Sequence, residues 1–295
     1  MSSRESHSET MLVRALEKAK RAATRERGIR ALKEDKAAPS RAVCAAIRAA
    51  REDTLAPEER AWAERIEALR ARLNASTREV ARVDFGAGDP HSSRDAATMS
   101  EGVTVRETLG DVSRNASKSP FWCRFLFALV RAAAPASSVE MGSAVGISAA
   151  YQAAALRVLG NGGRFATLEG APSLAAITTE NLRSLDLHEV DVIVGRFADT
   201  LPAVLAARRP LDYVFVDGHH DGEATLAYFE MLLPHLAPRA FLVFDDIAWS
   251  DGMRRAWDRI ARDDRVALSV DLGAVGVAVV DRTYPVPKRY RIPLY

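Results

Sequence analysis

Residues 137–281 alternate between short apolar runs and segments with helical spacing, and this alternation constrains the fold more than any other feature. The apolar runs that predict strands are 138–141, 164–168, 190–194, 211–216, 240–244, 266–270 and 275–280. Helical spacing fills the first five intervals between them, which indicates βαβ units and a parallel sheet. The last two runs are joined by residues 271–274 without a helix, which predicts a hairpin. We therefore predict an α/β fold with a seven-stranded, mostly parallel sheet and a C-terminal antiparallel hairpin strand.

The chain before this region has a different pattern. Apolar residues at helical spacing predict helices at about 10–25, 39–52 and 57–74, within a mainly helical N-terminal extension that covers residues 1–103. Helical spacing returns from Thr104, so we expect residues 104–136 to form a helical cap beside the functional site. The core would cover residues 137–281, and the proline-containing tail, 282–295, is expected to be irregular.

Composition excludes several classes of protein. The 41 basic and 39 acidic residues nearly balance, so the chain as a whole has no strong attraction for nucleic acid or an anionic membrane. Only two cysteines occur, which excludes a disulfide scaffold. No run approaches the ~20 apolar residues of a membrane span, and no signal peptide is recognised at the N-terminus. We therefore expect a cytoplasmic protein that does not bind membranes.

The residues that end the predicted strands carry the chemistry. Ligands of open α/β sheets bind beyond the carboxyl ends of the strands. The first strand ends in a turn that contains Gly142 and Gly146, the second at Glu169, the fourth at Asp217, and the fifth at Asp245-Asp246. The glycine spacing differs from the Gly-x-Gly-x-x-Gly pattern of dinucleotide-binding proteins. A carboxylate at Glu169 is suited to accept hydrogen bonds from both hydroxyl groups of a ribose.

These motifs resemble those of class I S-adenosylmethionine (SAM)-dependent methyltransferases, which have a Rossmann-like fold. Glu140-Met-Gly-Ser-Ala-Val-Gly146 is similar to the first motif of that family, with Ala144 where a third glycine is commoner. The resemblance implies that the turn holds the methionine part of SAM, that Glu169 binds the ribose and that Arg196 and Phe197 lie near the adenine. The implied cofactor-binding residues are Glu140, Gly142, Ser143, Gly146, Ser148, Glu169, Arg196, Phe197 and Asp217.

The acidic strand ends also resemble those of metal-dependent O-methyltransferases. The resemblance implies that Asp217, Asp245 and Asp246 bind a divalent cation, and oxygen ligands suit Mg²⁺. The alternative is that these acids cap helices or contact the cofactor. His219, two residues after Asp217, is the candidate general base, because an unperturbed imidazole can accept a proton at neutral pH. The alternative is that His219 only hydrogen-bonds its own loop.

We therefore expect a SAM-dependent enzyme that methylates a hydroxyl group of a small molecule, of the natural-product or sugar type, with His219 and Asp217 as catalytic residues. One alternative is an RNA or peptide methyltransferase that uses the basic N-terminal helices, although nucleic acid is the less favoured partner. A second alternative is a non-catalytic scaffold with the same fold. Dimerisation through the N-terminal helices is a further hypothesis.

Overall fold

The computed structural model describes residues 2–52, 54–88, 94–284 and 286–294, and side chains from residue 14 onward within these ranges. Its centre is a β-sheet that, within these ranges, has eight strands in the order β10-β8-β9-β7-β6-β3-β4-β5. The strands are β3 (Ser137–Met141), β4 (Arg164–Glu169), β5 (Val190–Val194), β6 (Leu211–Val216), β7 (Leu236–Phe244), β8 (Leu268–Asp271), β9 (Gly276–Asp281) and β10 (Lys288–Arg291). All seven predicted strands are present.

Strand direction follows the predicted connections. The strands β3 to β7 are parallel, because a helix returns the chain between each consecutive pair. The hairpin strand β9 pairs antiparallel with both β7 and β8. The α/β fold with a mostly parallel sheet and an antiparallel C-terminal strand is therefore confirmed.

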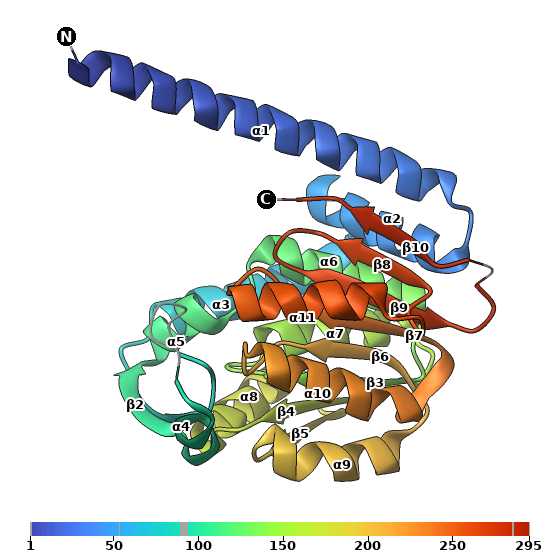
Figure 1. Cartoon of the computed structure of the whole chain (residues 1–295). Coiled ribbons are helices and arrows are strands. Elements are labelled where there is room, and N and C mark those ends of the chain that lie inside the picture. Colours follow the sequence, from blue (N-terminus) through green and yellow to red (C-terminus); the bar gives the residue numbers. More distant parts are fainter. Residues whose placement is uncertain (1, 53, 89–93, 285, 295) are drawn as a thin grey trace.

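Helices cover both faces of the sheet (Figure 1). One face carries α9 (Phe197–Arg208), α10 (Gly222–Leu232) and α11 (Asp251–Arg262), and the other carries α6 (Pro120–Ala133), α7 (Ile147–Leu159) and α8 (Pro172–Ser184). Side chains of a strand alternate between the two faces. In β6, Val214 and Val216 pack against the first group of helices, whereas Tyr213 and Phe215 pack against the second. The sheet is consequently buried on both sides.

The predicted N-terminal helices are present as α1 (Ser2–Glu34), α2 (Ala38–Glu52) and α3 (Pro57–Asn74). Helix α2 packs on α6, and α3 packs on α7, so both extend the core beyond the sheet. Helix α1 contacts α2 and β10 near its C-terminal end, and its N-terminal part projects away from the body (Figure 1). No helix in the described part of the chain is long and apolar enough to cross a membrane.

Two local predictions were wrong. Residues 103–108 form a strand rather than a helix: β2 (Val103–Thr108) pairs antiparallel with β1 (Glu79–Asp84), and α4 (Ala96–Glu101) lies between them. Helix α5 (Leu109–Ala116) follows, so the segment predicted as a helical cap starts as a hairpin. Within the tail, which was expected to be irregular, β10 adds an eighth strand in the described residues, parallel to β8. Both segments become strands because a partner strand is beside them, which local spacing does not reveal.

Candidate active site

The turn between β3 and α7 contains three residues with left-handed backbone angles. Gly142 has φ +101°, and a Cβ atom there would lie 2.0 Å from the carbonyl oxygen of Asp217. Gly146 has φ +85°, with Thr178 beside it. Ala144 is also left-handed, at φ +47°, the region that glycine enters at least cost. The turn therefore brings its backbone against the end of β6, and together with the start of α7 it lines a pocket.

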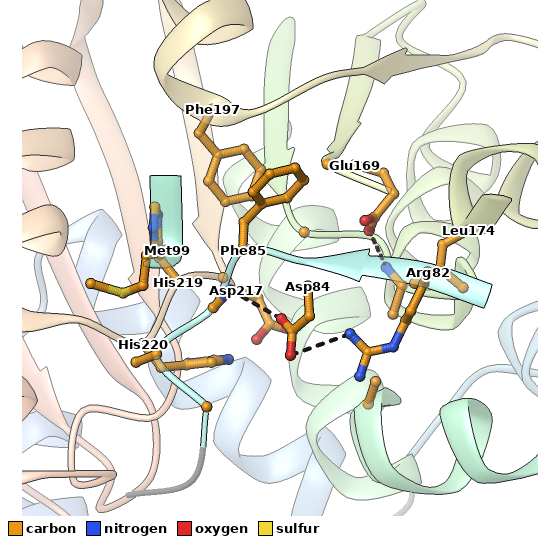
Figure 2. Close-up of a pocket in the computed structure, with 18 of the residues that line it drawn as sticks. Arg82, Asp84, Phe85, Met99, Glu169, Leu174, Phe197, Asp217, His219 and His220 are labelled. Carbon is orange, nitrogen blue, oxygen red and sulfur yellow. Dashed lines mark hydrogen bonds and ion pairs between the residues drawn. The ribbon is translucent and has the colours of Figure 1, made fainter. Parts of the chain in front are cut away.

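Glu169 at the end of β4 joins this turn to the next strand. Its Oε2 accepts a hydrogen bond from the backbone N–H of Ala144 at 2.9 Å, and its Oε1 accepts one from Ala171 at 2.9 Å. Burial raises the pKa of the Glu169 carboxyl, although these backbone donors oppose that shift. The carboxylate lines a pocket at this edge of the sheet (Figure 2), and its remaining lone pairs are suited to the vicinal hydroxyls of a ribose.

Glu140 has a different environment. Its side chain is fully buried beneath the turn, where Oε1 accepts a hydrogen bond from Gln152 at 2.8 Å and Oε2 accepts one from Thr167 at 2.6 Å. Burial raises the pKa of Glu140 to about 7. Glu140 does not line the pocket in the described residues, so any effect on the cofactor would pass through the packing of β3 and α7.

A pocket of about 940 Å³ opens at the carboxyl ends of the parallel strands. The predicted site residues that line it are Gly142, Ser143, Ser148, Glu169, Arg196, Phe197, Asp217, His219 and Asp246. Gly146 and Asp245 lie behind this lining, as does Glu140. Arg196 forms an ion pair with Asp199 at 2.7 Å and donates to the carbonyl oxygen of Ser100 at 2.8 Å, so it ties α4 to the rim.

The opposite wall comes from the β1–β2 hairpin and α4, which no motif in the sequence links to the site. Phe85 follows β1 and packs over the backbone of Gly170, while Phe197 packs over Gly218 (Figure 2). Met99 from α4 also lines the pocket. Asp84 binds Arg94 at 3.0 Å and contacts Arg82 at 3.5 Å, which fixes the base of this wall. The sequence carries only a weak sign of this hairpin, the partial alternation of apolar residues at 79–84 and 103–108.

His219 lies at the pocket with a left-handed backbone, φ +71°. Its Nδ1 is 2.5 Å from the hydroxyl oxygen of Tyr228, and its ring packs against Phe197 with centroids 6.3 Å apart. Burial lowers the pKa of His219 below its ordinary value. In the tautomer in which Nδ1–H donates to Tyr228, Nε2 carries the lone pair that can accept a proton from a ligand.

The three aspartates lie together at the ends of β6 and β7, but a lysine lies among them. The ammonium of Lys118 forms an ion pair with Asp217 at 3.3 Å and a hydrogen-bonded ion pair with Asp245. Burial lowers the pKa of Lys118, but the nearby carboxylates of Asp217 and Asp246 outweigh this effect, so its net pKa is raised. Asp246 faces Nδ1 of His220 at 3.4 Å. These contacts do not match a metal-ligand set, and the described residues contain no group of three or more His, Cys, Asp or Glu suited to a metal ion.

The fold and the site together define a Rossmann-like domain of the class I methyltransferase type. The strand order, the left-handed turn after β3, the acid ending β4 and the pocket beyond the strands agree with that class. Residues 139–247 match the family model described as a methyltransferase domain. For residues 139–247, this match agrees with the resemblance drawn from the sequence.

Comparison with solved structures gives weaker likenesses. An O-methyltransferase from Bacillus cereus in complex with S-adenosylhomocysteine (SAH) is 26% identical, with a TM-score of 0.49, over 57% of this chain and 84% of that one. The O-methyltransferase TomG from Streptomyces achromogenes, in complex with SAM, is 24% identical, with a TM-score of 0.47, over 56% of this chain and 81% of that one. No curated protein gives a significant match.

Proposed function

We propose that this protein transfers the methyl group of SAM to a hydroxyl oxygen of a small molecule. The observation that carries the proposal is the pocket in which His219 faces the same space as the turn after β3 and Glu169. One pocket then offers a cofactor site and a base next to each other. Methyl transfer requires both reactants to be held in line, which such a shared pocket can provide.

The size and walls of the pocket favour a small acceptor. Its volume of about 940 Å³ lies near the upper end of the range of ~300–1,000 Å³ for small-molecule sites, enough for a cofactor and a compact second ligand. Met99 provides apolar surface for the acceptor, and Phe85 and Phe197 provide it for the adenine of the cofactor. Arg82 and Arg94 are paired with carboxylates, so they offer little free charge to a phosphate backbone.

The residues fit SAM on one structural observation in particular: Gly142, Ser143 and Ala144 line the pocket in a turn whose close backbone approach to Asp217 excludes a Cβ atom at Gly142. Bound SAM supplies an electrophilic methyl group on a sulfonium. This methyl group would pass to the acceptor oxygen, and the electron pair of the C–S bond would stay on sulfur in the departing SAH. We propose that Nε2 of His219 takes the hydroxyl proton, that Glu169 holds the ribose and that Phe85 and Phe197 flank the adenine.

The test combines calorimetric titration with SAH and a tritium-transfer assay. The assay offers SAM with separate panels of hydroxylated small molecules (phenols, catechols and sugars), RNA and peptides. The proposal predicts SAH binding and label in small-molecule products. The absence of SAH binding would contradict the methyltransferase assignment itself, whereas label found only in RNA or peptide would contradict the acceptor class.

Magnesium assistance was part of the expectation from sequence, and the mechanism proposed here assigns it no step. The reason is the ion pairing of Asp217 and Asp245 with Lys118, which already neutralises part of the acidic cluster. Methyl transfer in the presence of EDTA tests this point directly.

A further inference from the structure

Lys118 lies at the centre of the acidic strand ends, although it comes from a distant part of the chain. It is the middle residue of the three that join α5 to α6. Its side chain reaches Asp217 at the end of β6 and Asp245 at the end of β7. The side chains of Lys118, Asp217 and Asp245 are 16%, 10% and 2% exposed, respectively, so the cluster is largely shielded from water.

The loop that carries Lys118 is held on both sides. Ser117 N–H donates to the carbonyl oxygen of Ser113 at 3.2 Å and ends α5, and Pro120 begins α6. The carbonyl oxygen of Lys118 accepts a contact from Sγ of the buried Cys123 at 3.4 Å. Arg70 on α3 contacts the same sulfur at 3.4 Å and is itself held by Glu67. The ammonium is therefore positioned by packed helices rather than by a free surface loop.

An ammonium and a divalent ion compete for the same oxygens. Mg²⁺ requires near-octahedral oxygen ligands at about 2.0–2.1 Å, so it must lie directly between the carboxylates that share it. The ammonium of Lys118 binds Asp217 and Asp245 from this side. A cation cannot approach both oxygens unless the lysine leaves, and its departure would expose two buried carboxylates without a counter-charge, which is costly.

We propose that Lys118 is the built-in cation of this site, which takes the place of a divalent metal and makes methyl transfer independent of Mg²⁺. This inference rests on the proposed methyltransferase function and extends it to the electrostatics of the acceptor side. Two of the three N–H donors of the ammonium bind Asp217 and Asp245. Among the described residues no third carboxylate pairs with it, and Lys118 lines the pocket, so the third donor can face an acceptor oxygen. Lys118 thus positions Asp217 and supplies one fixed positive charge.

The first test uses the unmodified full chain and needs no acceptor. Titration with Mn²⁺, followed by electron paramagnetic resonance with and without SAH, is expected to give no stoichiometric site. Because this readout does not depend on turnover, it remains informative if the methyltransferase assignment fails, and SAH calorimetry tests that assignment separately. A one-to-one Mn²⁺ site that is lost in both Asp217→Asn and Asp245→Asn would overturn the proposal.

The second test removes the charge. Lys118→Ala is expected to acquire a stoichiometric Mn²⁺ site and to lose metal-free methyl transfer, with partial recovery when Mn²⁺ is added. Lys118→Met keeps most of the side-chain volume and serves if the alanine variant fails to fold, as judged by thermal melting. Lys33→Ala, an exposed lysine of α1, is the matched control and should behave like the unmodified chain. Folded Lys118→Ala and Lys118→Met variants that bind no Mn²⁺ would overturn the role of Lys118 as a substitute cation.

Discussion

The backbone N–H of Ala144 donates a hydrogen bond to Oε2 of Glu169 at 2.9 Å, so one carboxylate joins the turn after β3 to the end of β4. Its Oε1 is held by Ala171 in the same way. Because both oxygens are fixed by backbone donors, the carboxylate keeps one orientation before any ligand binds. This prearrangement reduces the ordering that binding would otherwise require.

Glu169→Gln is expected to weaken SAH binding by about 10- to 100-fold, because a hydrogen bond to a charged group contributes about 1.5–3 kcal/mol. In the glutamine side chain, the NH₂ group would replace one of the two carboxylate oxygens, and it could not accept the hydrogen bond from the backbone N–H that faces it. Calorimetry measures the effect, and Glu180→Gln on the exposed side of α8 is the control. An unchanged dissociation constant for Glu169→Gln would remove Glu169 from the cofactor site.

Gly142→Ala is expected to abolish SAH binding and lower the melting temperature. Its Cβ atom would lie 2.0 Å from the backbone oxygen of Asp217, at φ +101°. Gly162→Ala is a matched control, because Gly162 also has a positive φ, +69°, but no atom lies within 4 Å of a Cβ there. A Gly142→Ala variant that is no less stable than Gly162→Ala would contradict the close approach of the two strand ends.

Ala144→Gly is expected to keep SAH binding and to leave stability unchanged or slightly higher, since φ is +47° at this position. Ala144→Val should instead destabilise the protein by about 1–3 kcal/mol, because a β-branched residue is strained in the left-handed region. Urea unfolding of the unmodified protein and of the two variants measures these differences in stability. Equal stability of the valine and glycine variants would show that the turn relaxes freely.

Removal of His219 should lower kcat while SAH binding persists. His219→Asn is expected to lose about 10²- to 10⁴-fold in kcat, the usual range for a general base. Since burial lowers the pKa of His219, the base stays neutral further into the acid range, and kcat should fall only below about pH 6.5. Tyr228→Phe, which removes the partner of Nδ1, should cause a smaller loss. An acid limb above pH 6.5 would assign the proton transfer to another group.

Glu140 should make the protein less stable as the pH rises. Its pKa is raised from 4.5 to about 7 in the folded state, so the native protein binds a proton that the unfolded chain releases between these values. The free energy of unfolding therefore contains a favourable contribution from protonated Glu140 that is complete below pH 4.5 and is lost as the pH rises to 7. At 1.36 kcal/mol per pKa unit, the loss is at most about 3 kcal/mol. Urea unfolding from pH 4.5 to 8 should show this slope, and Glu140→Gln should flatten it. The same slope in both proteins would refute the assignment.

The helices and strands of the core were largely predictable because their apolar residues repeat. Val43 and Ile47 in α2, and Trp62 and Ile66 in α3, are buried at the helical spacing that predicted them. The five parallel strands were found from apolar runs, which are typical of strands covered on both faces. The strands that were missed, β2 and β10, are partly polar (β2 Val103–Thr108, β10 Lys288–Arg291), so their spacing gave no strong signal.

The candidate site was predictable to a smaller extent. Glu169 and Asp217 were identified because strand ends of a parallel sheet share one edge. Phe85 and Met99 were not, because they reach the pocket only through the pairing of β1 with β2. The metal hypothesis was based on the acids at the strand ends alone. Lys118, which lies among them, is 99 positions before Asp217 and 127 before Asp245, so the sequence did not indicate that they meet.

The sequence by itself determined the alternating sheet, the glycine turn after β3 and the acids at the strand ends, since each depends on local spacing and on the known direction of parallel strands. Tertiary structure alone decided the hairpin wall of the pocket, the burial of Glu140 away from it and the partners of the aspartates. The physical reason is that the charge state of an acid cluster depends on every group within a few ångströms. Packing of α5 and α6 against the sheet brings Lys118 within that distance of Asp217 and Asp245.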